Sequence, residues 1–205
     1  KVAHCDDVLC SSSTNTVLYS DQKRFGTPFI TIGPDGYPLI SCNGSTYTSD
    51  RMIRLTHCED HACNNFTVQD VFDPRGTSID DRPAPRAVGL DGLPVIASYD
   101  GRNWEGPKLI HCDTITCSTY TMNEILGSSV ETYDVAIGVD GMPLLVAGNR
   151  VIHCHDSACN NSTVSTLYQS VTHFASIAIG PDGMPVIAFF TGSSPYDLAV
   201  ARCDD

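Results

Sequence analysis

A six-residue pattern, Gly-x-Asp-Gly-x-Pro, occurs four times in this chain and restricts its possible folds more than any other feature. The four copies begin at Gly33, Gly89, Gly138 and Gly180. Successive copies therefore start 56, 49 and 42 residues apart. A period of about 50 residues is typical of propeller blades and of arrays of similar β units. The pattern predicts a fold built from four copies of one structural unit.

Each copy of the unit shows the same order of strand signals. An apolar stretch such as residues 29–32 enters the Asp-Gly turn, where Gly supplies positive φ, and the chain leaves at the Pro that opens residues 38–41. A third stretch, such as residues 53–58, ends at a cysteine, and a fourth, such as residues 65–68, follows the next cysteine. We therefore predict an all-β fold, a four-bladed β-propeller-like repeat of four-stranded antiparallel units. A β-sandwich or barrel is the alternative.

The chain has the length of one domain, so we expect a single β-repeat domain over residues 1–205. The repeat units are expected at approximately residues 10–58, 63–112, 117–154 and 159–203. A surplus strand at residues 1–5 copies the third strand of the last unit, and the two cannot occupy one place. The surplus strand can add to the outside of blade four, pair with a neighbouring molecule, or mark the chain as a segment of a longer array.

The repeat resembles the cysteine-containing Gly-x-Asp-Gly-x-Pro repeats of propeller type that occur in secreted proteins. The resemblance covers nearly the whole chain and rests on the four turn motifs and the cysteines that follow them. It implies the fold and says little of function, because propellers serve in binding, catalysis and scaffolding alike.

Eight of the ten cysteines form pairs that are always five residues apart, namely Cys5/Cys10, Cys58/Cys63, Cys112/Cys117 and Cys154/Cys159. A zinc site is the alternative interpretation, because His precedes the first cysteine of each pair. Adjacent residues of a strand point to opposite faces, so these His and Cys side chains should not converge on one ion. We predict four disulfides and no metal. Cys42 and Cys203 are unassigned: they can bond each other, stay free or cross-link to another chain.

Disulfides need an oxidising compartment, so we predict an extracellular, secreted protein. Sequons for glycosylation begin at Asn43, Asn65, Asn160 and Asn161 and agree with that location. The formal charge of −12 disfavours a nucleic-acid partner, and no apolar run is long enough to span a membrane.

The residues that recur in every unit are interpreted as structural. We expect His4, His57, His111 and His153 to pack or to form hydrogen bonds on the blades, and the turn aspartates to form hydrogen bonds within their turns. The D-x-D-x-D-G spacing of a calcium loop and the usual nucleophile and phosphate-binding motifs are all lacking. We therefore predict no cofactor and no enzymatic activity.

Residues outside the repeat are better candidates for specificity. The segment that contains Tyr99, Asp100, Asn103 and Trp104 combines the only tryptophan with polar groups, a composition suited to sugar stacking. Packing of Trp104 over a blade is the alternative. Residues 73–86, which are rich in proline and charge, are expected to form a solvated loop.

The function predicted from these features is that of a non-enzymatic structural or adhesive protein that assembles head to tail by strand addition at its termini, with a filament as one form of the assembly. Its partner is then a second copy of itself. The candidate assembly residues are Lys1, Val2, Ala3, His4, Leu198 and Val200. A propeller that binds glycans as a lectin is the alternative.

Overall fold

The computed structural model describes residues 1–20, 24–45, 51–72, 85–99, 106–127, 130–167, 171–192 and 196–203. Its secondary structure in these ranges consists of strands, β1 to β17. None of the described residues forms a helix that could cross a bilayer. The predicted all-β class is confirmed.

Three of the sheets are four-stranded antiparallel meanders whose strands pair in chain order. Blade 1 contains β3 (Arg24–Ile32), β4 (Pro38–Ser45), β5 (Arg51–Cys58) and β6 (Phe66–Phe72). Blade 2 contains β7 (Arg86–Val88), β8 (Pro94–Tyr99), β9 (Pro107–Cys112) and β10 (Tyr120–Glu124). Blade 3 contains β11 (Thr132–Ile137), β12 (Pro143–Ala147), β13 (Arg150–Cys154) and β14 (Ser162–Thr166).

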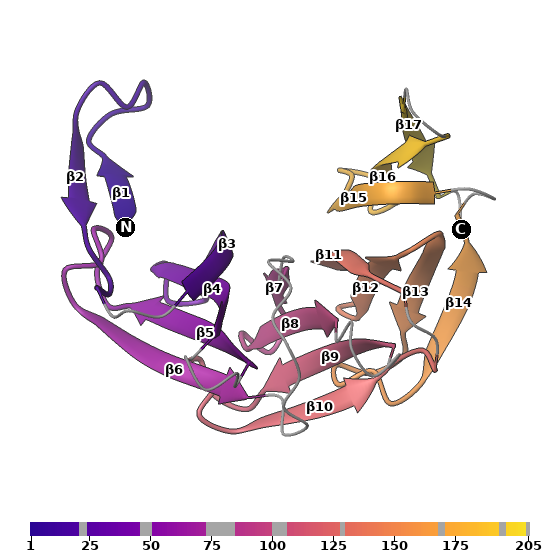
Figure 1. Ribbon diagram of the computed structural model, residues 1–205, viewed down its shortest axis with the longest axis horizontal. Coiled ribbons are helices and arrows are strands. Elements are labelled where there is room, and N and C mark those ends of the chain that lie inside the picture. Colours follow the sequence, from indigo (N-terminus) through magenta and orange to yellow (C-terminus); the bar gives the residue numbers. More distant parts are fainter. Residues whose placement is uncertain are drawn as a thin grey trace.

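The two ends of the chain form smaller sheets. Blade 4 has three strands, β15 (Val171–Ile179), β16 (Pro185–Thr191) and β17 (Asp197–Arg202). At the start of the chain β1 (Val2–Cys5) pairs with β2 (Ser13–Thr16) in a hairpin. Figure 1 shows the sheets side by side along an open arc, with the β1–β2 hairpin at one end and blade 4 at the other. The fold is therefore propeller-like, and its ring is not closed.

This arrangement corrects one reading of the surplus strand. In the structure β1 does not add to the outside of blade 4, because it pairs with β2 at the opposite end of the arc. The β1–β2 hairpin instead takes the place of the third and fourth strands of a blade that precedes blade 1. Val2 and Leu18 pack against the Cys58–Cys63 disulfide of blade 1, just as Leu55 packs against the next disulfide along the arc.

The Asp-Gly turns join the first and second strands of each blade. In blade 1 the Gly36 N–H donates to the carbonyl oxygen of Gly33 at 3.0 Å, and Gly36 has a φ of +84°. An L side chain adopts that conformation only with strain, which accounts for the second glycine of the motif. A Cβ on Gly33 would lie 2.8 Å from the carboxylate of Asp35, which accounts for the first.

The core lies between blades. One cluster combines Leu39 and Leu55 of blade 1 with Ile96 and Ile110 of blade 2. Equivalent clusters join blade 2 to blade 3 and blade 3 to blade 4. Each blade is thus stabilised mainly by apolar contacts with its neighbours, as in other repeat proteins.

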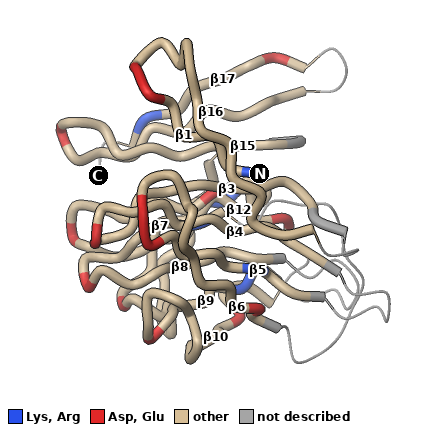
Figure 2. The backbone as a smooth tube through the Cα atoms, turned by 90° about the vertical axis from the view of Figure 1, so that its left-hand side faces the viewer, with Lys and Arg blue, Asp and Glu red and all other residues tan. Residues whose placement is uncertain are grey.

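Both kinds of short connection lie at one edge of the arc, because the strands of each blade alternate in direction. One kind is the Asp-Gly turn, and the other is the cysteine loop between the third and fourth strands. Much of the acidic charge also lies along this edge (Figure 2). We call this side of the arc the turn edge. The polar contacts that recur from unit to unit lie there.

Candidate functional site

Each turn aspartate joins its turn to the third strand of the same blade. In blade 1, Asp35 Oδ1 accepts the N–H of Tyr37 at 3.2 Å, and its Oδ2 lies 2.7 Å from His57 Nε2. Burial alone would raise the pKa of Asp35, but these hydrogen bonds outweigh it and hold the pKa below its usual value. The hydrogen bond within the turn confirms the sequence prediction.

The same contact recurs in the other three blades. Asp91 pairs with His111 at 2.8 Å, Asp140 with His153 at 2.7 Å, and Asp182 with Arg202 at 2.6 Å. A contact that recurs in all four blades meets a structural requirement that the blades share. We therefore interpret these pairs as structural links between the turn and the third strand.

His4 occupies the same position in β1, one residue before the cysteine, and it is the exception. The described residues offer it no carboxylate, because the turn that would supply one belongs to strands that the β1–β2 hairpin does not contain. Its ring lies 6.3 Å from the ring of His61, centroid to centroid. His4 thus stands at the strand position from which the other histidines contact a turn aspartate, but no turn aspartate lies beside it among the described residues.

The four predicted disulfides, Cys5–Cys10, Cys58–Cys63, Cys112–Cys117 and Cys154–Cys159, are all present. In the loop between Cys58 and Cys63 the Asp60 carboxylate accepts the N–H groups of Ala62, Asn64 and Asn65. Asp7 and Asp156 hold equivalent loops in the same way. Sequence reasoning missed this role, although Asp stands two positions after the first cysteine in three of the four pairs, with Thr114 in the other.

The zinc alternative finds no support in the described part of the chain. No group of three or more His, Cys, Asp or Glu side chains there could hold a metal ion. Where a His precedes the first cysteine in blades 1 to 3, its Nε2 lies against the turn aspartate instead.

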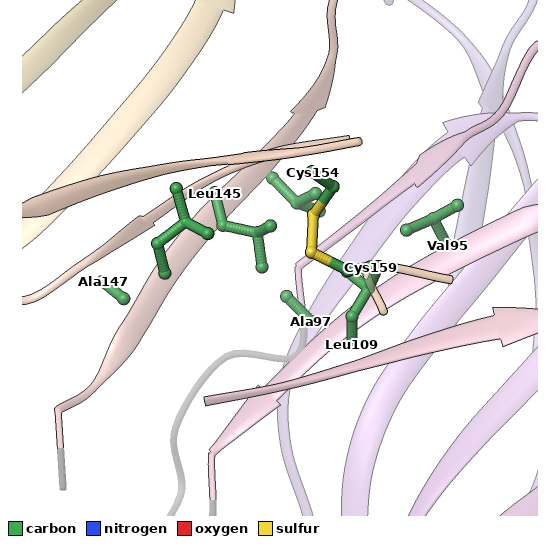
Figure 3. Packing of buried hydrophobic residues seen from close by; sticks show 9 residues of the cluster. Val95, Ala97, Leu109, Leu145, Ala147, Cys154 and Cys159 are labelled. Carbon is green, nitrogen blue, oxygen red and sulfur yellow. A yellow bond between two sulfur atoms is a disulfide. The ribbon is translucent and has the colours of Figure 1, made fainter. Parts of the chain in front are cut away.

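Three of the disulfides are buried against the preceding sheet. Cys154 and Cys159 lie between Leu145 of their own blade and Val95 and Leu109 of blade 2 (Figure 3). Cys112–Cys117 packs on blade 1 in the same manner, and Cys58–Cys63 packs on the β1–β2 hairpin. Cys5 and Cys10 are exposed. Each buried disulfide loop is therefore part of the contact between two neighbouring sheets. The Cys5–Cys10 loop, at the end of the arc that holds the β1–β2 hairpin, has no such neighbour among the described residues.

The first strand of blade 1 is uncovered as well. In blades 2 to 4 the residue before the turn packs on the preceding blade, and these residues are Val88, Ile137 and Ile179. Its equivalent Ile32 is 58% exposed, and Ile30 two residues earlier is 64% exposed. A Cβ on Gly92 would touch Pro34 of the preceding turn, whereas one on Gly36 would meet nothing within 4 Å.

The other end of the arc exposes the opposite face. The residue three positions before the cysteine is buried as Leu55, Leu109 and Val151 in blades 1 to 3. Its equivalent in blade 4, Val200, is 66% exposed, and Leu198 is 69% exposed. Among the described strands β17 pairs with β16 alone. The two ends of the arc thus expose the two halves of the contact that joins every pair of neighbouring blades.

The predicted assembly residues divide between these surfaces and the core. Lys1 and Ala3 are exposed, and His4 is half-buried. Val2 is only 9% exposed because its side chain packs on blade 1.

Other predicted residues lie as follows. Asn65, Asn160 and Asn161 are exposed at the start of fourth strands, whereas Asn43 lies in β4 with its amide oxygen buried. Asp100, Asn103 and Trp104 lie outside the described residues, and Tyr99 ends β8. Neither Cys42 nor Cys203 forms a disulfide.

One polar cluster is confined to the region where the link after β2 meets blades 1 and 2. The Tyr19 hydroxyl lies 3.0 Å from Cys42 Sγ, and the Arg54 guanidinium makes a two-point ion pair with Asp70 at 2.6 and 2.8 Å. Burial raises the pKa of the Cys42 thiol. The other blades carry Ser98, Ala147 and Phe189 at the position of Cys42. No sequence motif marks this cluster, because its members come from segments far apart in the chain.

Arg86 borders this cluster from β7 and is buried, although residues 73–86 were expected to form a solvated loop. Residues 73–84 lie outside the described residues. Arg86 Nη2 donates to the carbonyl oxygen of Phe29, while its Nε and Nη1 have no hydrogen-bond partner among the described residues. Burial lowers the pKa of Arg86 to about 9. The prediction of a solvated loop is wrong for Arg86, because β7 begins where blade 2 packs against blade 1.

Comparison with known proteins supports the fold alone. No protein-family model and no curated protein matches the chain. A solved structure of a protein of unknown function from Dyadobacter fermentans superposes with a TM-score of 0.66 at 14% identity, over 93% of this chain and 68% of that one. At that identity the likeness extends to the architecture only.

Two further structures are more distant. The virginiamycin B lyase of Staphylococcus aureus matches with a TM-score of 0.48 at 10% identity, over 90% of this chain and 74% of the lyase. A catalytically inactive variant of that lyase with quinupristin gives a TM-score of 0.45 at 11% identity, over 88% and 71% of the two chains. Likenesses of this size carry no argument about activity.

Proposed function

We propose that this protein is a non-enzymatic, secreted structural or adhesive unit of the cysteine-containing propeller-type repeat class, and that copies of it assemble head to tail. The blade 4 end of one copy contacts the blade 1 end of the next. One observation carries the proposal. Apolar positions that are buried wherever two blades of the chain meet are exposed at the two ends of the arc.

The surfaces at the two ends are complementary because they repeat an interface that the chain already forms within itself. Ile30 and Ile32 present the face that packs on a preceding blade, and Leu198 and Val200 lie on the face that receives a following one. Contiguous exposed apolar residues of this kind mark interaction sites. A contact between unlike ends is heterologous, so it closes into a ring or continues as a filament.

Three observations support the rest of the proposal. Four disulfides are consistent with an extracellular protein. The polar cluster of blade 1 holds its thiol at a raised pKa, whereas a nucleophilic cysteine needs a lowered one. The repeated Asp–His pairs already serve as structural links in the blades.

The test compares two substitutions that place a charge on an exposed strand residue. Ile32→Asp lies on the end face, and Val164→Asp, the control, lies on β14 at the outer side of blade 3, where Val164 is 41% exposed. Mass photometry and negative-stain microscopy of the wild type should show oligomers or filaments. We expect the control to assemble and Ile32→Asp to stay at the monomer mass of 22.1 kDa. A wild type that is monomeric at micromolar concentration would refute the proposal.

A further inference from the structure

The strands β1 and β17 are near copies of each other and occupy equivalent places in their sheets. Residues 2–7 read Val-Ala-His-Cys-Asp-Asp, and residues 200–205 read Val-Ala-Arg-Cys-Asp-Asp. Both are third strands of a blade. Among the described strands the β1–β2 hairpin pairs with no first or second strand, and blade 4 pairs with no fourth strand. The hairpin thus corresponds to the third and fourth strands of a blade, and blade 4 to the first, second and third.

We propose that the joint between two copies is one shared blade, in which β1 of the neighbouring copy replaces β17 at the edge of β16. This inference rests on the proposed head-to-tail assembly and identifies the partner segment. The shared sheet runs β15 and β16 from one copy, then β1 and β2 from the neighbouring copy. It is four-stranded and antiparallel, like the sheets of blades 1 to 3.

The register of β17 on β16 defines where β1 of the neighbouring copy would pair. Within one chain Val200 lies opposite Ala188, and Arg202 lies opposite Val186. Val2 and His4 are the equivalents of Val200 and Arg202, counted from Cys5 and Cys203. His4 of the neighbouring copy then faces Asp182, which Arg202 contacts at 2.6 Å within the chain. The histidine without a turn aspartate thus gains the same partner that His57, His111 and His153 have.

The exchange also covers the surfaces left open at the first end of the arc. Ile30 and Ile32 of the neighbouring copy meet β16, as Ile179 meets the second strand of blade 3. The Cys5–Cys10 loop comes to lie on blade 3, where Leu144 and Val151 form the receiving face.

The Asp-Gly turns add a further match. Leu90 and Val139 each lie against the glycine of the next turn along the arc, as Pro34 lies against Gly92. Pro181 is the exposed equivalent in blade 4, and Gly36 has open space around it. In the shared blade Pro181 of one copy reaches Gly36 of the neighbouring copy, which continues the row of turns across the joint.

Strand exchange makes opposite predictions for the two copies of the third strand. A carboxylate at position 4 would face Asp182 of the neighbouring copy and oppose the joint, because like charges in contact repel. A carboxylate at position 202 would face Asp182 within its own chain, loosen β17 and favour its replacement. If blades stacked instead with β17 retained, position 4 would have no aspartate to meet.

The experiment measures the dissociation constant of the assembly by mass photometry over a dilution series, for His4→Asp, Arg202→Asp and the control His155→Asp. His155 lies on the same edge in blade 3, so the control carries the same change of charge as His4→Asp. We expect His4→Asp to weaken assembly at least tenfold relative to the control and Arg202→Asp to strengthen it about threefold. Circular dichroism verifies that each variant is folded.

The outcomes separate the two proposals. Wild-type protein that does not assemble refutes the proposed function and the shared blade together. Assembly that His4→Asp leaves at the level of the control, or that Arg202→Asp weakens, refutes the shared blade and leaves head-to-tail stacking in place.

Discussion

Removal of the Cys112–Cys117 disulfide should destabilise the protein about twice as much as removal of Cys5–Cys10. Both bridges span five residues, so the loop-closure entropy that each removes from the unfolded chain is the same, about 2 kcal/mol. The second cysteine of each pair has a positive φ, of 53° at Cys10 and 57° at Cys117, so the strain on an alanine there is shared too.

The two bridges differ in what surrounds them. Cys112 and Cys117 are fully buried in the cluster between blades 1 and 2, whereas Cys5 and Cys10 are exposed. Replacing each buried sulfur by the hydrogen of an alanine loses apolar contact and leaves a cavity, which costs about 1 kcal/mol per atom. We therefore expect about 4 kcal/mol for the pair Cys112→Ala and Cys117→Ala, and about 2 kcal/mol for Cys5→Ala and Cys10→Ala.

The assay is urea unfolding followed by circular dichroism, without reductant, in the Ile32→Asp background so that association does not contribute. The free energies of unfolding of the two double variants are compared at equal protein concentration. Equal losses, within about 0.5 kcal/mol, would contradict the packing of the disulfide loops between blades, because the other contributions cancel.

Three further predictions use the same unfolding assay. Val151→Ala should cost about 2 kcal/mol and Val200→Ala less than about 0.5 kcal/mol, since only the first is buried; similar losses would contradict this difference. Hydrogen bonds hold the pKa values of the Asp35 and Asp140 carboxyl groups below 3.8. The stability that these ionised carboxylates contribute is therefore present above pH 4 and is lost as the pH falls through the lowered pKa values. A free energy of unfolding that does not change between pH 5 and about 3 would contradict this prediction. Arg86→Met should raise stability by about 1 kcal/mol, because it removes a buried guanidinium whose Nε and Nη1 have no hydrogen-bond partner among the described residues; a loss of stability would contradict this reasoning.

Local features of this fold could be predicted from the sequence because they depend on neighbouring residues. The Asp-Gly hairpins and the disulfides such as Cys58–Cys63 involve groups only a few positions apart, and both are confirmed. The link between Asp35 and His57 spans 22 residues and depends on the twist and register of three strands. Sequence spacing alone does not specify that distance.

Contacts between blades could not be predicted from the sequence either, because they join residues that lie far apart in the chain. The burial of Val2 depends on the hairpin lying against blade 1, and the burial of Arg86 depends on β7 lying against blade 1 from the other side. The candidate site at the ends of the arc could be predicted in part, because the surplus copy of the third strand is visible in the sequence. Which surfaces it leaves open became evident only from the exposure of Ile30 and Ile32.

The short span of the disulfides has a consequence for the way this protein is made. Eight cysteines can pair in on the order of a hundred ways, and a wrong pairing traps a chain until it is reshuffled. Here each bridging cysteine lies five residues from its partner, so a pair can form without any contact between units. None of the four disulfides in the described part of the chain joins one blade to another. A gene that gains or loses a whole unit therefore encodes a chain whose remaining cysteines oxidise as before, so the length of the arc can change without a new folding problem.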